Sequence, residues 1–138
     1  MQGTFLDTNI LLRHLLNDVP AQSQAAHRLI RAIEAGSVVA WTSALVIAEI
    51  VFALENPKTH HVGRSTLADH LQPLLALPHL KLERKRLYPR IFELYVSLPI
   101  DYVDAYHAAL LEHYGQHELY SFDQDFDAIP GMTRREPQ

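Results

Sequence analysis

The sequence contains no cysteine, and this absence removes several classes of small protein. Disulfide frameworks and cysteine-ligated zinc sites are both excluded. The lack of cysteine also fits a reducing compartment. No secretory signal is recognisable at the start of the sequence, and no apolar run approaches the roughly 18 residues that a membrane-spanning helix needs. We therefore expect a cytoplasmic protein without a membrane segment.

The sequence also lacks an excess of positive charge. Its formal net charge is −4, with 12 Lys and Arg residues against 16 Asp and Glu residues. Proteins that bind nucleic acid through their overall charge are basic, so a generic nucleic-acid binder is disfavoured. A nuclease that uses metal ions is compatible with this charge, because its site must itself be acidic. Any contact with nucleic acid is then local or mediated by a metal ion.

The sequence does contain enough apolar material for one folded domain. Of its 138 residues, 48% are hydrophobic, and a chain of this length can bury a core without a disulfide or a structural metal. Short apolar segments alternate with longer segments of helical periodicity. This alternation predicts an α/β fold with a mainly parallel central sheet. We expect a single domain over residues 1–138, in which residues 130–138 form a frayed tail.

The expected elements follow from apolar periodicity and from capping residues. The predicted strands cover residues 3–7, 38–41, 80–83 and 118–122. The predicted helices cover residues 20–35, 44–55, 64–77, 86–98 and 101–114, after a first helix that starts near residue 8. Thr8 and Asn9 can cap the first helix, and Ser43 can cap the helix over residues 44–55. Sites in such folds form beyond the carboxyl ends of the strands, so polar residues there are the first candidates.

Glu49 lies in the most apolar helix of the sequence. The segment from Ala44 to Leu54 contains no other charged residue, so we expect this helix to be buried on every side. A buried carboxylate is costly unless it is paired or binds a metal ion. The alternative is that Glu49 lies at the edge of the core or pairs with an arginine.

Three further acids occupy positions where a structural role is also plausible. Asp7 ends the first predicted strand and could simply cap the helix that follows. Asp101 is a natural N-cap, and an acid at Asp104 favours the N-terminus of the same helix. The alanines that surround Asp104 indicate close packing against another element. Such packing would bury the carboxylate of Asp104.

Three aspartates alternate after the last predicted strand, at Asp123, Asp125 and Asp127. The alternation resembles the start of a calcium-binding loop. That loop requires Gly at its sixth position and Glu at its twelfth, where this sequence has Ala128 and Arg134. Aspartates in turns are usually solvated, and Asp123, nearest to the strand end, is the best candidate of the three for a site.

Four of these acids lie at a predicted strand end or on a helix that flanks the sheet: Asp7, Glu49, Asp104 and Asp123. Oxygen ligands, without cysteine and without a convincing histidine spacing, indicate Mg²⁺ or Mn²⁺ rather than zinc. Such ions bridge phosphate oxygens, activate water and offset the charge of the transition state.

Four short motifs carry a resemblance to a known family. They are Leu6-Asp7-Thr8-Asn9, Ala48-Glu49-Ile50, Asp104-Ala105-Tyr106-His107-Ala108-Ala109 and Ser121-Phe122-Asp123-Gln124-Asp125-Phe126. In order and spacing they resemble the four blocks of the PIN-domain family over almost the whole chain. The resemblance implies a three-layer α/β/α fold and metal-dependent cleavage of RNA by a cluster of carboxylates. The small size of the chain is similar to that of VapC toxins, which pair with a cognate antitoxin.

The resemblance also implies roles for individual residues. The implied catalytic residues and metal ligands are Asp7, Glu49, Asp104 and Asp123. Asp101 matches an additional acid that many members have. The polar residues that support the acids are Thr8, Asn9 and Ser121. At Tyr106-His107 the sequence departs from the family, in which aliphatic residues are more usual.

Two residues near these acids are candidates for contact with RNA. His107 lies one helical turn after Asp104, where it could approach the phosphate or the leaving group. A packed or solvent-facing histidine is the more common role for such a residue. Arg13 follows Asp7 closely in the sequence and could contact the RNA backbone.

The sequence thus predicts a Mg²⁺-dependent endoribonuclease, the toxin of a toxin–antitoxin pair that cleaves cellular RNA. One alternative is a DNA nuclease or phosphatase that uses the same acids. The other is a non-catalytic interaction module of the same fold, which the presence of all four acids disfavours. For protein contacts, the helix over residues 64–77 offers an apolar groove for the antitoxin or a homodimer face. Its leucines could equally belong to the core: Leu67, Leu71, Leu74 and Leu75.

Overall fold

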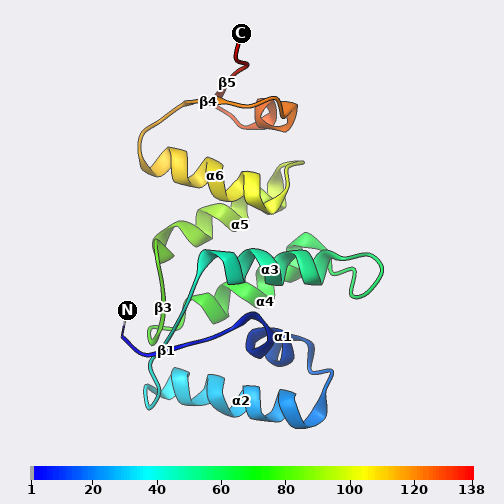
Figure 1. The fold of residues 1–138 in the computed structure, drawn as a ribbon, viewed down its shortest axis with the longest axis vertical. Coiled ribbons are helices and arrows are strands. Elements are labelled where there is room, and N and C mark those ends of the chain that lie inside the picture. The colour runs from blue at the N-terminus through cyan, green and yellow to red at the C-terminus, as the bar shows by residue number, and fades with distance from the viewer. Residues whose placement is uncertain (1) are drawn as a thin grey trace. The chain divides into compact units, whose positions relative to one another are not determined.

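Short parallel strands alternate with helices along the chain, and the predicted α/β class is confirmed. The computed structural model describes residues 2–138 (Figure 1). These residues form two units, of which the first ends at Lys85 and the second begins at Arg86. In this part of the chain no helix combines the length and the apolarity that crossing a lipid bilayer requires.

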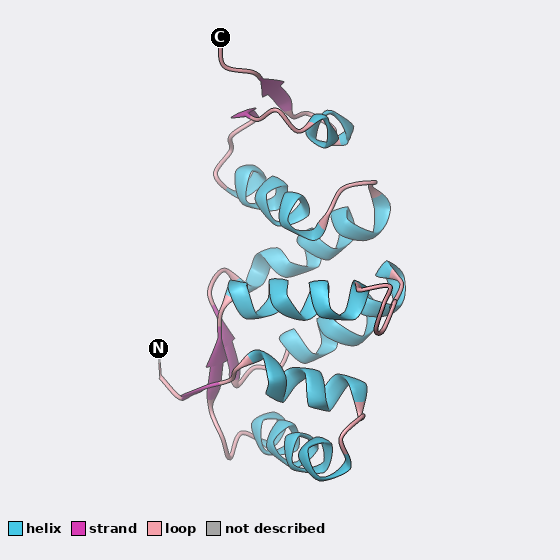
Figure 2. Cartoon of the chain, turned by 45° about the vertical axis from the view of Figure 1, so that its right-hand side comes forward, coloured by secondary structure: helices cyan, strands magenta, loops and turns pink. Residues whose placement is uncertain are grey.

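The first unit contains a three-stranded parallel sheet, drawn in magenta in Figure 2. Its strands are β1 (Thr4–Phe5), β2 (Ala40–Thr42) and β3 (Leu80–Leu82). They lie in the order β1-β2-β3, so β2 is the central strand. Ala40 pairs with Thr4 on one side and with Leu80 on the other. Ala40 and Leu80 are fully buried, which places the centre of this sheet in the core.

Four helices accompany this sheet: α1 (Thr8–Leu16), α2 (Pro20–Ala35), α3 (Ala44–Glu55) and α4 (Arg64–Leu75). The bounds of α2 and α3 agree with the prediction, whereas α4 ends two residues earlier than expected. Gly36 ends α2 with a φ of 82°, and a Cβ atom at this position would lie 2.9 Å from Nε2 of His79. Ser43 caps α3 as predicted, because its side chain accepts a hydrogen bond from the amide of Val46.

Of the two interpretations of the cap of α1, capping by Thr8 or Asn9 is wrong, and capping by Asp7 is confirmed. The N-cap is Asp7, whose Oδ1 accepts a hydrogen bond from the amide of Thr8 at 2.8 Å. Thr8 and Asn9 are the first two residues of the helix itself. An aspartate at the end of a strand satisfies the first free amide of the next helix as well as a hydroxyl does.

The expectation that α3 is buried on every side is also wrong. Ile47, Ile50 and Val51 are fully buried, but Leu45 is 77% and Phe52 is 49% exposed. Glu49 lies on the exposed face. An apolar composition predicts that a helix has buried surface, but it does not tell which of its faces has a partner within the chain.

The leucines of α4 belong to the core of the first unit. Their exposed fractions lie between 0% and 6%: Leu67, Leu71, Leu74 and Leu75. Of the two interpretations of these side chains, the structure therefore supports the core. These four side chains therefore do not form an exposed face of the first unit.

The second unit contains two helices and a pair of parallel strands. The helices are α5 (Tyr88–Ser97) and α6 (Tyr102–His113), and the strands are β4 (Glu118–Tyr120) and β5 (Thr133–Arg135). A 3₁₀ turn, η1 (Lys85–Leu87), precedes α5 where the sequence predicts helix from residue 86. A second 3₁₀ turn, η2 (Gln124–Ala128), follows β4. Tyrosine and phenylalanine rings of α5 and α6 form the core between them: Phe92, Tyr95 and Tyr102.

The strand β5 corrects the expectation of a frayed tail over residues 130–138. Leu119 of β4 pairs with Arg134 of β5. The guanidinium of Arg134 is ion-paired with Asp127 at 3.1 Å and with Glu136 at 3.0 Å. It also donates a hydrogen bond to the main-chain oxygen of Ser121 at 3.0 Å. Backbone pairing and ion pairs hold this strand, and neither leaves a mark in the hydrophobic pattern of the sequence.

Candidate metal centre

Asp7 is positioned by the end of β1 and by a contact from the neighbouring strand. The amide of Leu6 donates to the main-chain oxygen of Trp41 at 2.8 Å. The buried hydroxyl of Thr42 in turn donates to the main-chain oxygen of Leu6 at 2.9 Å. These two bonds hold the chain on β2 immediately before Asp7. The carboxylate of Asp7 therefore lies at the carboxyl end of the sheet, as the sequence predicts for a site residue.

Thr8 connects the two predicted acids of the first unit. Its amide donates to Oδ1 of Asp7 at 2.8 Å, and its hydroxyl donates to Oε2 of Glu49 at 2.8 Å. Asp7 and Glu49 are both exposed. The first unit thus brings two of the four predicted acids to one threonine, and one oxygen of each acid already has a hydrogen-bond donor.

Asn9 and Arg13, also predicted as site residues, contact other parts of the first unit. Both line a pocket of about 400 Å³ beside α2, together with Ala26. The guanidinium of Arg13 is ion-paired with Asp18 at 3.1 Å. The charge of Arg13 is therefore partly neutralised by an acid that lies just beyond the C-terminus of α1.

In the second unit, Asp104 is a buried acid, with only 8% of its surface exposed. It lies in the first turn of α6, and its amide donates to Oδ1 of Asp101 at 2.8 Å. Asp101 is therefore the N-cap of the helix, and the carboxylate of Asp104 is not needed for capping. Oδ2 of Asp104 is buried and has no hydrogen-bond partner. Such an oxygen is rare in folded proteins and calls for an explanation.

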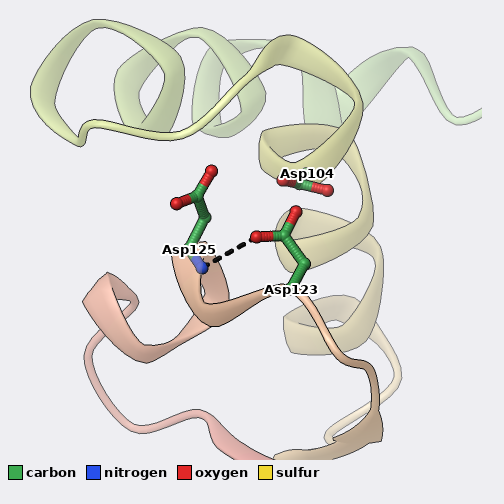
Figure 3. Close-up of side chains that lie close together, drawn as sticks. All are labelled: Asp104, Asp123 and Asp125. Atoms are coloured by element: carbon green, nitrogen blue, oxygen red, sulfur yellow. Dashed lines mark hydrogen bonds between the residues drawn. The ribbon is translucent and has the colours of Figure 1, made fainter.

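Asp123 and Asp125 belong to the turn that follows β4, and their carboxylates lie next to that of Asp104 on α6 (Figure 3). Ser121 Oγ accepts from the amide of Asp123 at 3.0 Å, and Asp123 Oδ1 accepts from the amide of Asp125 at 2.9 Å. One carboxylate oxygen from each of the three aspartates lies within 4.8 Å of the other two. Two elements distant in sequence therefore converge on one group of carboxylates, which we call the aspartate cluster (Asp104, Asp123 and Asp125).

The surroundings raise the pKa of Asp104 to about 6. Burial is the main cause, because it penalises the charged form, and the negative charges of Asp101 and Asp123 add to it. A cation would relieve both conditions, since it would offset the charges and give the unpartnered oxygen a partner. Carboxylate oxygens of this kind suit a divalent ion such as Mg²⁺, Mn²⁺ or Ca²⁺. The residues of the aspartate cluster therefore fit a divalent metal ion.

Comparison with protein families decides what kind of domain carries these acids. The sequence model of the PIN domain matches residues 4–132. The chain belongs to the PIN domain family. Members of this family are generally nucleases that bind divalent metal ions through acidic residues, and the three-layer α/β/α class predicted from the sequence is that of the family. No curated protein matches the sequence.

The match to the PIN domain spans both units and all the acids predicted from the sequence. Asp7 and Glu49 lie in the first unit, whereas Asp101, Asp104 and Asp123 lie in the second. In the first unit Thr8 brings Asp7 and Glu49 together, and in the second unit Asp104 and Asp123 meet in the aspartate cluster, whereas Asp101 caps α6.

Asp125 is a member of the aspartate cluster that the sequence analysis did not select. Its signal in the sequence is the alternation of Asp123, Asp125 and Asp127, which resembles a calcium loop but lacks the Gly and the Glu that such a loop requires. In this chain the alternating residues form the 3₁₀ turn η2, in which the amide of Asp125 donates a hydrogen bond to the carboxylate of Asp123. Asp127 instead pairs with Arg134. Asp125 and Asp127 therefore have different roles, because Asp125 joins the aspartate cluster and Asp127 forms an ion pair.

Proposed function

We propose that this PIN domain is a Mg²⁺-dependent endoribonuclease. The observation that carries the proposal is the buried Asp104, whose Oδ2 lacks a partner while carboxylate oxygens of Asp123 and Asp125 lie within 4.8 Å. A carboxylate with this environment is costly in the absence of a cation. The membership of a family of nucleases supports phosphodiester cleavage as the reaction.

In this proposal the aspartate cluster holds the metal ion, and Asp7 and Glu49 complete the catalytic set predicted from the sequence. A bound Mg²⁺ supplies phosphate binding, activation of water and compensation of negative charge. The chain itself orients the ligands. Ser121 and the amide of Asp125 fix the loop and carboxylate of Asp123, and Thr8 fixes the carboxylate of Glu49. Asp101 acts on Asp104 through its charge and through the helix cap.

We also propose that the nuclease is the toxin of a toxin–antitoxin pair, acting in the cytoplasm as a homodimer. The resemblance of the motifs and of the chain length to VapC toxins supports this role. A free ribonuclease is hazardous to the cell that makes it, so a protein inhibitor is expected. Expression of the wild type alone should arrest growth, and Asp104→Asn should relieve the arrest. Equal arrest by both proteins would contradict the toxin role.

The activity is tested with RNA, DNA and a small phosphomonoester side by side. RNA should be cleaved with Mg²⁺ or Mn²⁺, and cleavage should stop in EDTA and return when the ion is restored. Asp104→Asn should abolish cleavage, whereas the matched change Asp69→Asn, at an exposed position of α4, should not. Cleavage of RNA in excess chelator would contradict the proposal.

The other two substrates decide between the alternatives. Cleavage of DNA or of the phosphomonoester, with RNA intact, would assign the same acids to a DNA nuclease or a phosphatase. Metal binding without cleavage of any substrate would identify a non-catalytic module.

A further inference from the structure

A pocket of about 420 Å³ adjoins the aspartate cluster within the second unit. Asp104 and Asp123 line it, together with His107 of α6, Tyr120 of β4 and apolar side chains that include Leu111. Its volume lies in the range of sites that bind small organic groups, and such sites combine apolar walls with a few polar residues. The pocket therefore continues from the carboxylates onto a surface that suits a flat, partly polar group.

Among the large hydrophobic side chains that line this pocket, Tyr120 is the exposed one. It follows Leu119 at the end of β4 and is 74% exposed. The neighbouring Phe122 is 72% exposed but does not line the pocket. The tyrosines at the helix interface behave differently, since Tyr95 and Tyr102 are almost fully buried. An exposed aromatic ring beside the aspartate cluster offers a face on which another flat ring can stack.

The basic side chains near this surface are already paired. Arg134 binds Asp127 and Glu136, and Arg135 binds Glu118 at 2.8 Å. These guanidinium groups therefore offer little free charge to the phosphates of a nucleic acid. Contacts to groups other than phosphate would therefore add to the binding of a substrate at this acidic surface. The nucleobases are the parts of a nucleic acid that provide such contacts.

We propose that this pocket is a base-binding subsite of the nuclease. One nucleobase next to the cleaved phosphate stacks on Tyr120, and His107 forms a hydrogen bond with the edge of that base. A base held inside a duplex must first be unpaired and unstacked before it can turn onto a protein ring, whereas an unpaired base can do so directly. An unpaired base therefore reaches the subsite at a lower cost than a paired base, and this inference rests on the proposed function.

The test uses a single-stranded oligoribonucleotide with one mapped cleavage site, and variants of two exposed aromatic residues. Tyr120→Ala should raise KM about five- to a hundredfold, the range measured for loss of one stacked base. Tyr120→Phe keeps the ring and should stay near the wild type. Phe122→Ala is the matched control, because Phe122 is as exposed as Tyr120 but lies outside the pocket. An abasic ribose beside the cleaved phosphate should weaken the wild type and have little further effect on Tyr120→Ala.

Binding without cleavage gives a second readout. With 2-aminopurine beside the cleaved phosphate and Ca²⁺ in place of Mg²⁺, stacking on Tyr120 should quench the fluorescence, and Tyr120→Ala should remove the quenching. Cleavage of RNA with an unchanged KM in Tyr120→Ala and no quenching would overturn the subsite and leave the nuclease proposal intact. Quenching without cleavage by any metal would overturn the nuclease proposal and retain the subsite. Equal cleavage of duplex and single-stranded RNA would also contradict the inference.

Discussion

The two units hold their acids in different ways. In the first unit Asp7 and Glu49 are exposed, and Thr8 donates a hydrogen bond to each carboxylate. In the second unit Asp104 is buried, one of its oxygens has no partner, and Asp123 supplies negative charge beside it. The carboxylates of the first pair are solvated and hydrogen-bonded, whereas burial and neighbouring negative charges penalise the charged form of Asp104. The dependence on a metal ion should therefore be largest in the second unit.

The largest expected effect is on the stabilisation by metal. Mg²⁺ binds the folded cluster alone, so it should stabilise the wild type by about 2.7 kcal/mol at a hundredfold excess over its dissociation constant. Asp104→Asn removes one of the repelling charges, and the metal-free variant should melt at or above the wild type while gaining less from Mg²⁺. Thermal melts of both proteins with and without Mg²⁺ measure this. Asp7→Ala, which removes the hydrogen-bonded cap of α1 in the first unit, should lower the metal-free melting temperature instead. Identical behaviour of the two variants would remove the distinction between the units.

The next effect distinguishes two aspartates of one turn. Asp125→Asn should lower the rate of RNA cleavage about tenfold to a hundredfold, because Asp125 contributes an oxygen to the cluster. Asp127→Asn should leave the rate near that of the wild type and lower the melting temperature, because Asp127 pairs with Arg134. Steady-state cleavage assays and thermal melts of both variants give the answer. A slower Asp127→Asn enzyme with an active Asp125→Asn enzyme would reverse the assignment.

A smaller effect is expected at Thr8. Thr8→Val keeps the shape of the side chain but removes the hydrogen bond to Glu49, and cleavage should fall about tenfold, as for other residues that orient a metal-site ligand. Thr8→Ser keeps the hydroxyl and should restore most of the activity. If Thr8→Val and Thr8→Ser cleave RNA equally fast, the contact with Glu49 has no role in the reaction.

The smallest effects concern pH, and they should have opposite signs in the two units. The pKa of Asp104 is raised from 3.8 to about 6 by burial and by Asp101. A raised pKa of an acid stabilises the fold below its unfolded value, and this contribution is lost as the pH rises through about 6. His14 has a lowered pKa, because it is partly buried and lies beside His27 with their Nδ1 atoms 2.7 Å apart. Its contribution is present above pH 6.5 and is lost as the pH falls through the lowered value.

Thermal melts of the metal-free protein from below pH 3.8 to above pH 6.5 separate the contribution of Asp104 from that of His14. The variants Asp104→Asn and His14→Gln serve as controls. Asp104→Asn should flatten the loss of stability towards neutral pH, and His14→Gln should flatten the loss towards acid pH. A loss of stability that neither variant changes would show that other groups govern the pH dependence.

Properties that depend on neighbouring residues were mostly predicted correctly, whereas several properties that depend on contacts between distant segments were not. The bounds of α2 and α3 were predicted because their signals are local: Pro20 and Gly36 limit one helix, and Ser43 caps the other. The exposed face of α3 was not predicted, because it depends on which elements pack against that helix. The sequence motifs likewise selected Asp104 and Asp123, but the membership of Asp125 in the cluster was missed.

By itself, the sequence determined the order of the six helices and the first four strands, the family and the acids that carry its motifs, because periodicity, capping and motif spacing are properties of neighbouring residues. The alanines around Asp104 predicted its burial, which is confirmed, but only the tertiary structure decided that its Oδ2 has no partner and that Asp125 rather than Asp127 stands beside it. It also decided that Arg134 holds a strand in the expected tail. Convergence of charges and ion pairing depend on segments that meet only in the folded chain, so no local pattern specifies them.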